Sequence, residues 1–251
     1  MKLLRDTWLT FLYETGMLVR NPVNIAITLI QPITYLVIFT PFLKAVMNAS
    51  TYGAAYQVYV PSLFAAMGVF SGMFAGFSLL GAIRQGVITR FRVTPLSRVG
   101  MLLGRELMYV VLVGFQAIVV VLAAAVLGLR VQVGYFLIAL ALLSVMVLLS
   151  VTISYALAMV VTNENSLATL INAVSQPISL LAGVLIPLSL APLWVQNVAL
   201  WNPFAWGTNA MRALFQGQIG NAVIWQAGII LVALSLVTVV LSSRLFSRGV
   251  A

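Results

Sequence analysis

The sequence predicts an all-α integral membrane protein with six transmembrane helices. Of its 251 residues, 63% are hydrophobic and 7% are charged, whereas a soluble domain carries about 25% charged residues. A membrane-spanning helix needs roughly 20 apolar residues, and the intervals between successive charged residues are long enough for six such helices. Five of the thirteen basic residues gather in one polar segment, 84–105, so this segment must lie in water between two spans.

The residue types that are absent narrow the possible functions. Without cysteine or histidine, the chain offers no disulfide, no Cys/His metal site and no Ser-His or Cys-His nucleophile. We therefore expect no catalytic residue, no metal site and no cofactor in this chain. The net charge of +9 is distributed by membrane side, which favours contact with anionic membrane lipids over nucleic acid. The first residues also lack the apolar core and cleavage site of a signal peptide.

Residues 1–20 are predicted to form an interfacial amphipathic helix on the cytoplasmic leaflet. Their apolar residues gather on one side of a helix, and the polar side carries Lys2, Arg5, Asp6 and Arg20. Span one, 23–43, follows the break at Asn21-Pro22. It carries a polar stripe with spacings of four, three and four residues: Asn24, Thr28, Gln31 and Tyr35. Lipid cannot satisfy these groups, so the stripe must face protein or a cavity.

An external loop over 44–57 is expected to lead into span two, 58–81. Within this span Gly68, Gly72 and Gly76 recur at every fourth residue, a pattern that lets two helices approach closely. The stripe can pack inside the same bundle or form the face of a dimer, and packing inside the bundle is the favoured reading.

The second half of the chain contains spans at 106–128, 135–161, 166–188 and 222–243. The span at 166–188 repeats the polar pattern with Thr169, Asn172, Gln176 and Ser179. Residues 189–221 are broken by prolines yet remain apolar, which predicts a re-entrant outer segment before span six, with tryptophans at headgroup level. Its candidate residues are Trp194, Trp201, Asn202, Pro203, Trp206 and Arg212.

Six spans place both termini on the same side of the membrane. Ten basic residues then share that side with segment 84–105, and three lie opposite: Lys44, Arg130 and Arg212. By the positive-inside rule, the side with ten is cytoplasmic. The expected location is the plasma (inner) membrane of a prokaryote.

Segment 84–105 is predicted to be a coupling loop with a short helix between spans two and three. Ile83, Val87 and Phe91 repeat every four residues, Pro95 ends the helix, and Ser97 can cap the next one. An aromatic edge among guanidinium groups suits insertion into a groove of a partner protein; the alternative is an ordinary positively charged loop. The coupling residues are Arg84, Gly86, Val87, Arg90, Phe91, Arg92, Pro95, Ser97 and Arg98.

The sequence contains no motor for transport. Neither lysine, Lys2 or Lys44, stands in the Gly-Lys-Ser/Thr of a phosphate-binding loop. An ion-coupled carrier normally places a carboxylate near the bilayer midplane. The four acidic residues instead fall at predicted cytoplasmic ends: Asp6, Glu14, Glu106 and Glu164. We therefore expect ATP and Mg on a separate ATPase chain, and an ion-coupled carrier or a membrane scaffold is less favoured.

Two motifs, in order along the chain, carry a resemblance to a known family. The first combines Gly86, Arg90-Phe91-Arg92, Pro95 and Ser97-Arg98 with Gly104-Arg105. The second runs from Leu181-Ala182-Gly183-Val184-Leu185-Ile186-Pro187 through Pro192 and Asn202-Pro203 to Arg212-Ala213-Leu214 and Gly217. With the length and the six-span pattern, these motifs resemble the permeases of ABC type 2 exporters, in the daunorubicin-resistance branch, over essentially the whole chain.

The resemblance implies a half-transporter, in which two permease chains assemble with two copies of a separately encoded ABC ATPase and export amphiphiles such as drugs or lipids. A permease for lipid-linked glycans is the alternative. Many relatives carry an acid before the glycine at 86, where this chain has Arg84-Gln85, and an Asp near Asn209, so roles of those acids do not carry over. The two polar stripes either line a shared dimer seam and substrate path or pair within one bundle.

Overall fold

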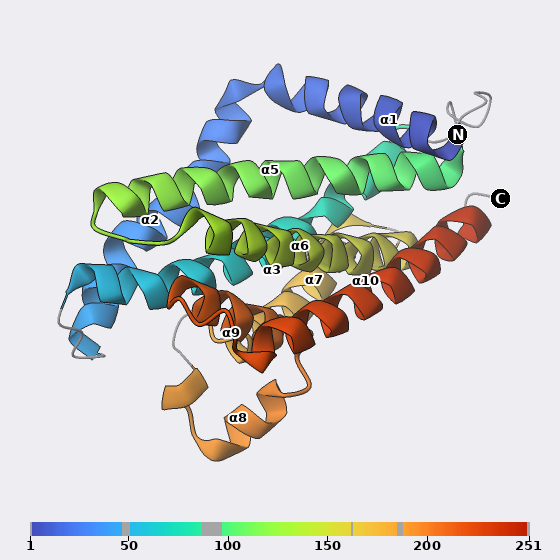
Figure 1. Ribbon diagram of the computed structural model, residues 1–251. Helices are drawn as coiled ribbons and strands as arrows, with labels where there is room; N and C mark the ends of the chain where they lie inside the picture. Colours follow the sequence, from blue (N-terminus) through green and yellow to red (C-terminus); the bar gives the residue numbers. More distant parts are fainter. Residues whose placement is uncertain (1, 47–50, 87–96, 162, 185–187, 250–251) are drawn as a thin grey trace.

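The computed structural model describes residues 2–46, 51–86, 97–161, 163–184 and 188–249. Nine α-helices and one 3-10 turn account for most of these residues, and no strand occurs among them (Figure 1). Five of the helices are long and apolar enough to cross a membrane. The expectation of an all-α membrane protein is therefore confirmed.

The elements follow one another along the chain with short connections. They are α1 (Lys2–Val19), α2 (Pro22–Val46), α3 (Tyr52–Arg84), α5 (Arg98–Val126), α6 (Val133–Val160), α7 (Glu164–Leu181), η1 (Leu188–Leu190), α8 (Leu193–Ala199), α9 (Pro203–Phe215) and α10 (Ala222–Gly249). The helices that meet the length and apolarity criteria for a span are α2, α3, α5, α6 and α10.

The bundle has two ends, which we name the loop end and the far end. The loop end carries the start of α1, the end of α3, the start of α5, the α6–α7 turn and the end of α10, on the right of Figure 1. The far end carries the end of α2, the start of α3 and the α5–α6 turn on the left, with α8 and α9 below.

Helix α3 forms the centre of the bundle, with 72% of its most apolar window buried. It packs most extensively on α6, where a β-carbon added at Gly72 would lie 2.3 Å from the Ser150 β-carbon. The backbone N–H of Gly76 donates to the Ser154 hydroxyl at 2.9 Å, and that hydroxyl donates to the Met73 carbonyl. The glycine stripe therefore packs within this chain, as the favoured reading expected.

Several helix boundaries differ from the sequence-based expectation. The expected external loop over 44–57 is mostly helical, because α2 continues to Val46 and Thr51 caps a helix that begins at Tyr52. Helix α5 begins at Arg98, eight residues before the expected span. Helix α7 ends at Leu181 instead of continuing to 188, because Gly183 adopts a left-handed φ of 70° that terminates the helix.

Candidate functional site

The predicted coupling loop is described only at its two flanks. Val87, Arg90, Phe91, Arg92 and Pro95 lie outside the described residues, as does the short helix predicted there. On the first flank, α3 ends at Arg84 and Gly86 has a left-handed φ of 69°. Arg84 Nη1 lies 3.3 Å from Glu164 Oε1, with both side chains about half exposed. This ion pair joins the end of α3 to the start of α7.

The second flank is fixed by a cap and by a carboxylate from α1. The Ser97 hydroxyl accepts a hydrogen bond from the Gly100 amide at 3.1 Å, so Ser97 caps α5 as expected. The Ser97 amide in turn donates to Asp6 Oδ2 at 2.8 Å. Arg98 is the first residue of α5. A negative charge at this position is favourable because a helix N-terminus carries partial positive charge.

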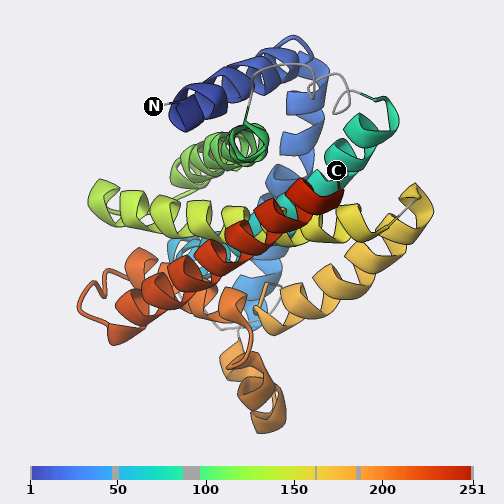
Figure 2. The same ribbon diagram turned by 90° about the vertical axis from the view of Figure 1, so that its right-hand side faces the viewer.

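Helix α1 packs against α5 through glycines and an ion pair (Figure 2). β-Carbons added at Gly100 and Gly104 would lie 2.9 Å and 2.6 Å from the β-carbons of Asp6 and Thr10. Further along, Arg105 Nε donates to Glu14 Oε1 at 2.7 Å, and both side chains are largely buried. The close helix approach therefore depends on the absence of side chains at two positions of α5.

This packing corrects the sequence-based view of α1. Asp6 was placed on its water-facing side, yet it is only 5% exposed, because its carboxylate is turned toward the start of α5. The exposed face instead carries apolar side chains, among them Leu4, Trp8 and Leu12. Helix α1 thus has an apolar face directed away from the bundle and an acidic face against α5.

Glu106 also lies where the sequence did not place it. It was expected at the cytoplasmic end of a span, but α5 begins two turns earlier and its side chain is fully buried. Both carboxylate oxygens lack a hydrogen-bond partner among the described residues. The hydroxyl of Tyr155, in α6, is likewise buried without a partner there. Each residue thus places a polar group inside the bundle.

The two polar stripes lie on helices that both pack on α3. Thr28, Gln31 and Tyr35 of α2 line a small cavity of about 40 Å³ together with Ser71 and Gln116. The side chain of Asn24 lies outside the described part of the chain. The α2 stripe therefore shares a cavity with polar groups of α3 and α5, although Thr28 and Gln31 remain exposed. Gln116, only 2% exposed, is a member of this cluster that the sequence analysis missed.

The stripe on α7 has different surroundings. Thr169, Asn172 and Gln176 are exposed, whereas Ser179 is buried and donates to the Gln176 carbonyl at 2.9 Å. Exposed amide groups along a helix of this bundle require water or another protein surface, because lipid offers them no partner. Both stripes therefore carry polar side chains that this chain leaves uncovered: Thr28 and Gln31 on α2, and Thr169, Asn172 and Gln176 on α7.

The outer segment is held to the bundle by Asn202 and Arg212. Asn202 caps α9 by accepting from the Phe204 amide at 3.0 Å, and its side-chain NH₂ donates to the Ile178 carbonyl at 2.8 Å. Pro203 occupies the first turn of α9. Trp206 Nε1 donates to the Leu200 carbonyl at 2.9 Å, while Trp194 and Trp201 of the α8 region are exposed.

Arg212 is a buried cation surrounded by neutral oxygens. Its Nη2 donates to the Ser62 hydroxyl at 2.7 Å and to the Gly183 carbonyl at 2.6 Å, and Nη1 lies 3.5 Å from Asn209 Oδ1. Burial lowers the pKa of Arg212 to about 10, so it remains protonated at neutral pH. One side chain thereby joins α9, α3 and the end of α7.

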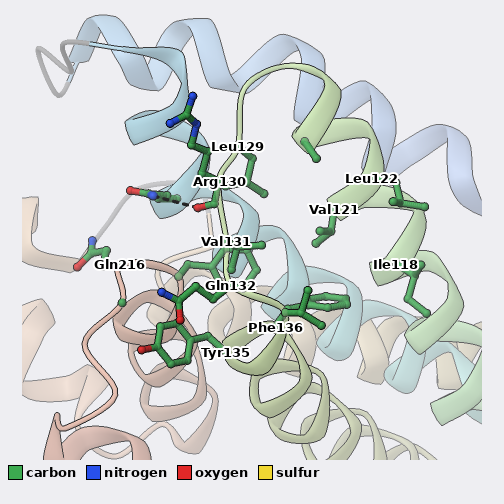
Figure 3. Close-up of a pocket in the computed structure, with 15 residues that line it drawn as sticks. Ile118, Val121, Leu122, Leu129, Arg130, Val131, Gln132, Tyr135, Phe136 and Gln216 are labelled. Atoms are coloured by element: carbon green, nitrogen blue, oxygen red, sulfur yellow. Dashed lines mark hydrogen bonds between the residues drawn. The ribbon is translucent and has the colours of Figure 1, made fainter.

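A larger cavity, of about 650 Å³, lies at the far end beside the α5–α6 turn (Figure 3). Ile118, Val121 and Leu122 form one side of it, and Gln132 and Tyr135 lie on the other (Figure 3). A further cavity of about 440 Å³ lies between α8, α9 and the start of α10.

Comparison with known proteins gives consistent matches. Residues 7–215 match the family model described as "ABC-2 type transporter". The chain is 27% identical over 231 residues to the daunorubicin resistance ABC transporter permease protein DrrB1 of Streptomyces coeruleorubidus, covering 89% of this chain and 78% of that protein. It is 26% identical over 206 residues to the putative transport permease ycf38 of Porphyra purpurea, covering 80% and 71% of the two chains.

Proposed function

From the premise that the chain belongs to the ABC-2 type transporter family and is a permease subunit of an ABC transporter, we propose that it exports amphiphilic compounds. In this proposal the loop end faces the cytoplasm of a prokaryote, with both termini, and the far end faces outward. A separately encoded ATPase holds ATP and Mg and drives the cycle. Two copies of that ATPase assemble with two permease chains.

Helix α7 is proposed to be the fifth of six spans along the chain, in addition to the five helices that meet the length and apolarity criteria. Its start is paired with the end of α3 through Glu164, and its end meets Ser62 of α3 through Arg212. Ser62 and Arg84 are 22 residues apart in one helix, or about 33 Å at a rise of 1.5 Å per residue, close to the thickness of a bilayer core. Helix α7 falls outside the hydropathy criterion because its exposed face is polar, which fits a helix covered by a second chain.

The observation that carries the coupling proposal is the anchorage of both flanks of the Arg-rich loop. Glu164 holds the first flank and the Asp6 carboxylate holds the second. Forces applied to residues 87–96 therefore reach α3, α5 and α7 through short, direct contacts. Arg90 and Arg92 are proposed to pair with carboxylates of the ATPase, and Phe91 to insert into an apolar groove between them.

The exposed stripe of α7 is the proposed seam between permease chains. Asn172 and Gln176 would line a substrate path there, and the exposed Thr28 and Gln31 of α2 border a small cavity within this chain. The relative from Streptomyces coeruleorubidus is named for daunorubicin resistance, which supports an amphiphilic drug or lipid as the substrate. Altered substrate selectivity in an Asn172→Leu variant at normal expression is the expected consequence.

The proposal is tested with an ABC ATPase that co-purifies with this chain. The pair is co-purified and reconstituted, and ATP hydrolysis and export are measured with a panel of amphiphiles and lipid-linked glycans. Phe91→Ala, and separately Arg90→Ala with Arg92→Ala, should abolish the stimulation of ATP hydrolysis by the transported compound. Insertion of these variants into the membrane should stay normal. Arg20→Ala, a cation outside the coupling loop, serves as the control. Export at the wild-type rate by the loop variants would contradict docking of the coupling loop on the ATPase. Stimulation by lipid-linked glycans alone would show that the substrate is a glycan and not an amphiphilic drug or lipid.

A further inference from the structure

The cavity beside the α5–α6 turn is amphipathic. One side of it is formed by the apolar side chains of Ile118, Val121, Leu122 and Ala125 of α5. Ile118 and Ala125 are two turns apart, roughly 10 Å along the helix axis. Ile118 and Leu122 are 41% and 62% exposed, so the cavity opens to the surface of the bundle, where lipid chains lie.

The side of the cavity opposite α5 carries its polar groups. Gln57, Arg130, Gln132, Tyr135 and Gln216 line it beside apolar side chains such as Val131 and Phe136, and Arg130 is the cation among these lining residues. Gln57 donates to the Arg130 carbonyl at 3.2 Å, which fixes the turn (Figure 3). The Arg130 guanidinium stands at the outer rim and makes no ion pair among the described residues. Its long side chain is free to reach a group at the rim.

The charge of this end selects the kind of ligand. All four carboxylates of the chain belong to α1, the first turns of α5 and the first residue of α7, so none lies near the cavity. The far end carries only cations, Lys44, Arg130 and Arg212. The change from apolar to polar runs along α5 toward its end, as the change from acyl chain to headgroup runs in the leaflet at that end.

We propose that this cavity binds an anionic phospholipid of the outward-facing leaflet. Arg130 pairs with the phosphate, Gln132 and Gln216 offer amide donors, and one acyl chain lies along Ile118, Leu122 and Ala125. The volume of about 650 Å³ lies within the roughly 300–1,000 Å³ of small-molecule sites, enough for a headgroup and part of one chain. The proposal needs the far end to lie at a membrane surface but does not depend on what the protein exports.

The test measures lipid binding without transport. Purified protein in detergent is titrated with phosphatidylglycerol or phosphatidylcholine, and bound lipid is counted by native mass spectrometry. Wild type should prefer phosphatidylglycerol. Arg130→Gln should weaken phosphatidylglycerol binding about fivefold or more and remove the preference. Ala125→Phe, which fills the apolar part, should weaken binding of both lipids. Lys44→Gln removes a cation of this end that does not line the cavity and lies over the Tyr52 ring, and it should change neither.

Three outcomes would overturn the site. Unchanged phosphatidylglycerol binding in Arg130→Gln would show that Arg130 does not contact the headgroup. An equal loss in Lys44→Gln would show that only overall charge matters. Displacement of the lipid by millimolar inorganic phosphate would show a bare anion site without an acyl chain. Because export is not measured, these results are independent of the proposed function.

Discussion

The two ends of the bundle are held together by different kinds of contact. At the loop end, carboxylates join the elements: Asp6 meets the start of α5, Glu14 pairs with Arg105, and Glu164 pairs with Arg84. At the far end no carboxylate is present among the described residues, and the buried Arg212 donates to neutral oxygens.

This difference in contacts fits the function proposed for each end. At the loop end the Arg84–Glu164 pair is about half exposed, and ion pairs that water can reach contribute little net stability, which suits a surface that moves with an ATPase. A buried cation with neutral partners is held by hydrogen bonds. When these break, the buried groups have no water to bond to instead. We therefore expect the far end to fail through loss of stability and the loop end to fail mainly through loss of coupling.

Substitution of Arg212 should have the largest effect on stability. Arg212→Met leaves the Ser62 hydroxyl and the Gly183 carbonyl buried without this donor, which should lower the free energy of unfolding by roughly 2–4 kcal/mol. Thermal and denaturant unfolding of the purified protein in detergent measure the loss. Asn209→Ala, which removes only the 3.5 Å contact, is the matched control. An Arg212→Met protein as stable as wild type would contradict the claim that the far end depends on these buried hydrogen bonds for its stability.

Helix α1 should be displaced by a single methyl group. In Gly104→Ala the new β-carbon meets the Thr7 carbonyl oxygen and the Thr10 β-carbon, each at 2.6 Å, and overpacking of this kind costs about 1–3 kcal/mol. Protease sensitivity of α1 should rise. Gly81→Ala, where the added carbon meets nothing within 4 Å, should be neutral or slightly stabilising. Equal protease resistance in both variants would show that α1 does not depend on this approach.

Removal of the Asp6 carboxylate, which accepts a hydrogen bond from the Ser97 amide, should have a moderate effect on stability. Asp6→Ala removes the acceptor for the Ser97 amide and should cost about 1 kcal/mol, within the roughly 0.5–2 kcal/mol of helix caps. It should also reduce stimulation of the ATPase, because the second flank of the coupling loop is released. Asp6→Asn keeps an acceptor and should retain part of both. Full coupling in Asp6→Ala would separate α1 from the coupling mechanism.

The smallest effect is expected at the exposed ion pair. Its side chains are 48% and 59% exposed, so Glu164→Gln should change the free energy of unfolding by about 0.5 kcal/mol or less. Glu14→Gln removes the negative charge beside Arg105 but keeps an oxygen acceptor. Because this pair is only 13% and 15% exposed, the change should cost more. Unfolding at low and high salt measures both. A larger loss in Glu164→Gln than in Glu14→Gln would reverse the ranking by burial.

Much of the fold was predictable because lipid imposes a simple rule on sequence. Long uncharged stretches must be helices, and the glycine stripe of α3 had to meet a close neighbour, which is α6. Helix ends were less predictable, because they depend on local groups. Gly183 ends α7 within an apolar run, and Thr51 starts α3 within a segment expected to be a loop.

The candidate site was less predictable, since its contacts join residues far apart in sequence. The pairings of Asp6 with Ser97 and of Arg212 with Ser62 and Gly183 leave no periodic signal. Asp6 looked like one more charge on the polar side of an amphipathic helix, and Gln116 like an isolated polar residue in an apolar run. Only Ser97, whose cap is local, was recognised from its neighbours.

The most direct test of the account asks whether the two ends lie on opposite sides of the membrane. The chain has no native cysteine, so single cysteines can be placed in the segments expected on the cytoplasmic side, at residues 90 and 165, and in those expected outside, at residues 50, 132 and 197. Intact cells are treated with a membrane-impermeant thiol reagent. The account predicts labelling at 50, 132 and 197, and protection at 90 and 165 until the cells are opened. Labelling at 90 or 165 in intact cells would contradict it.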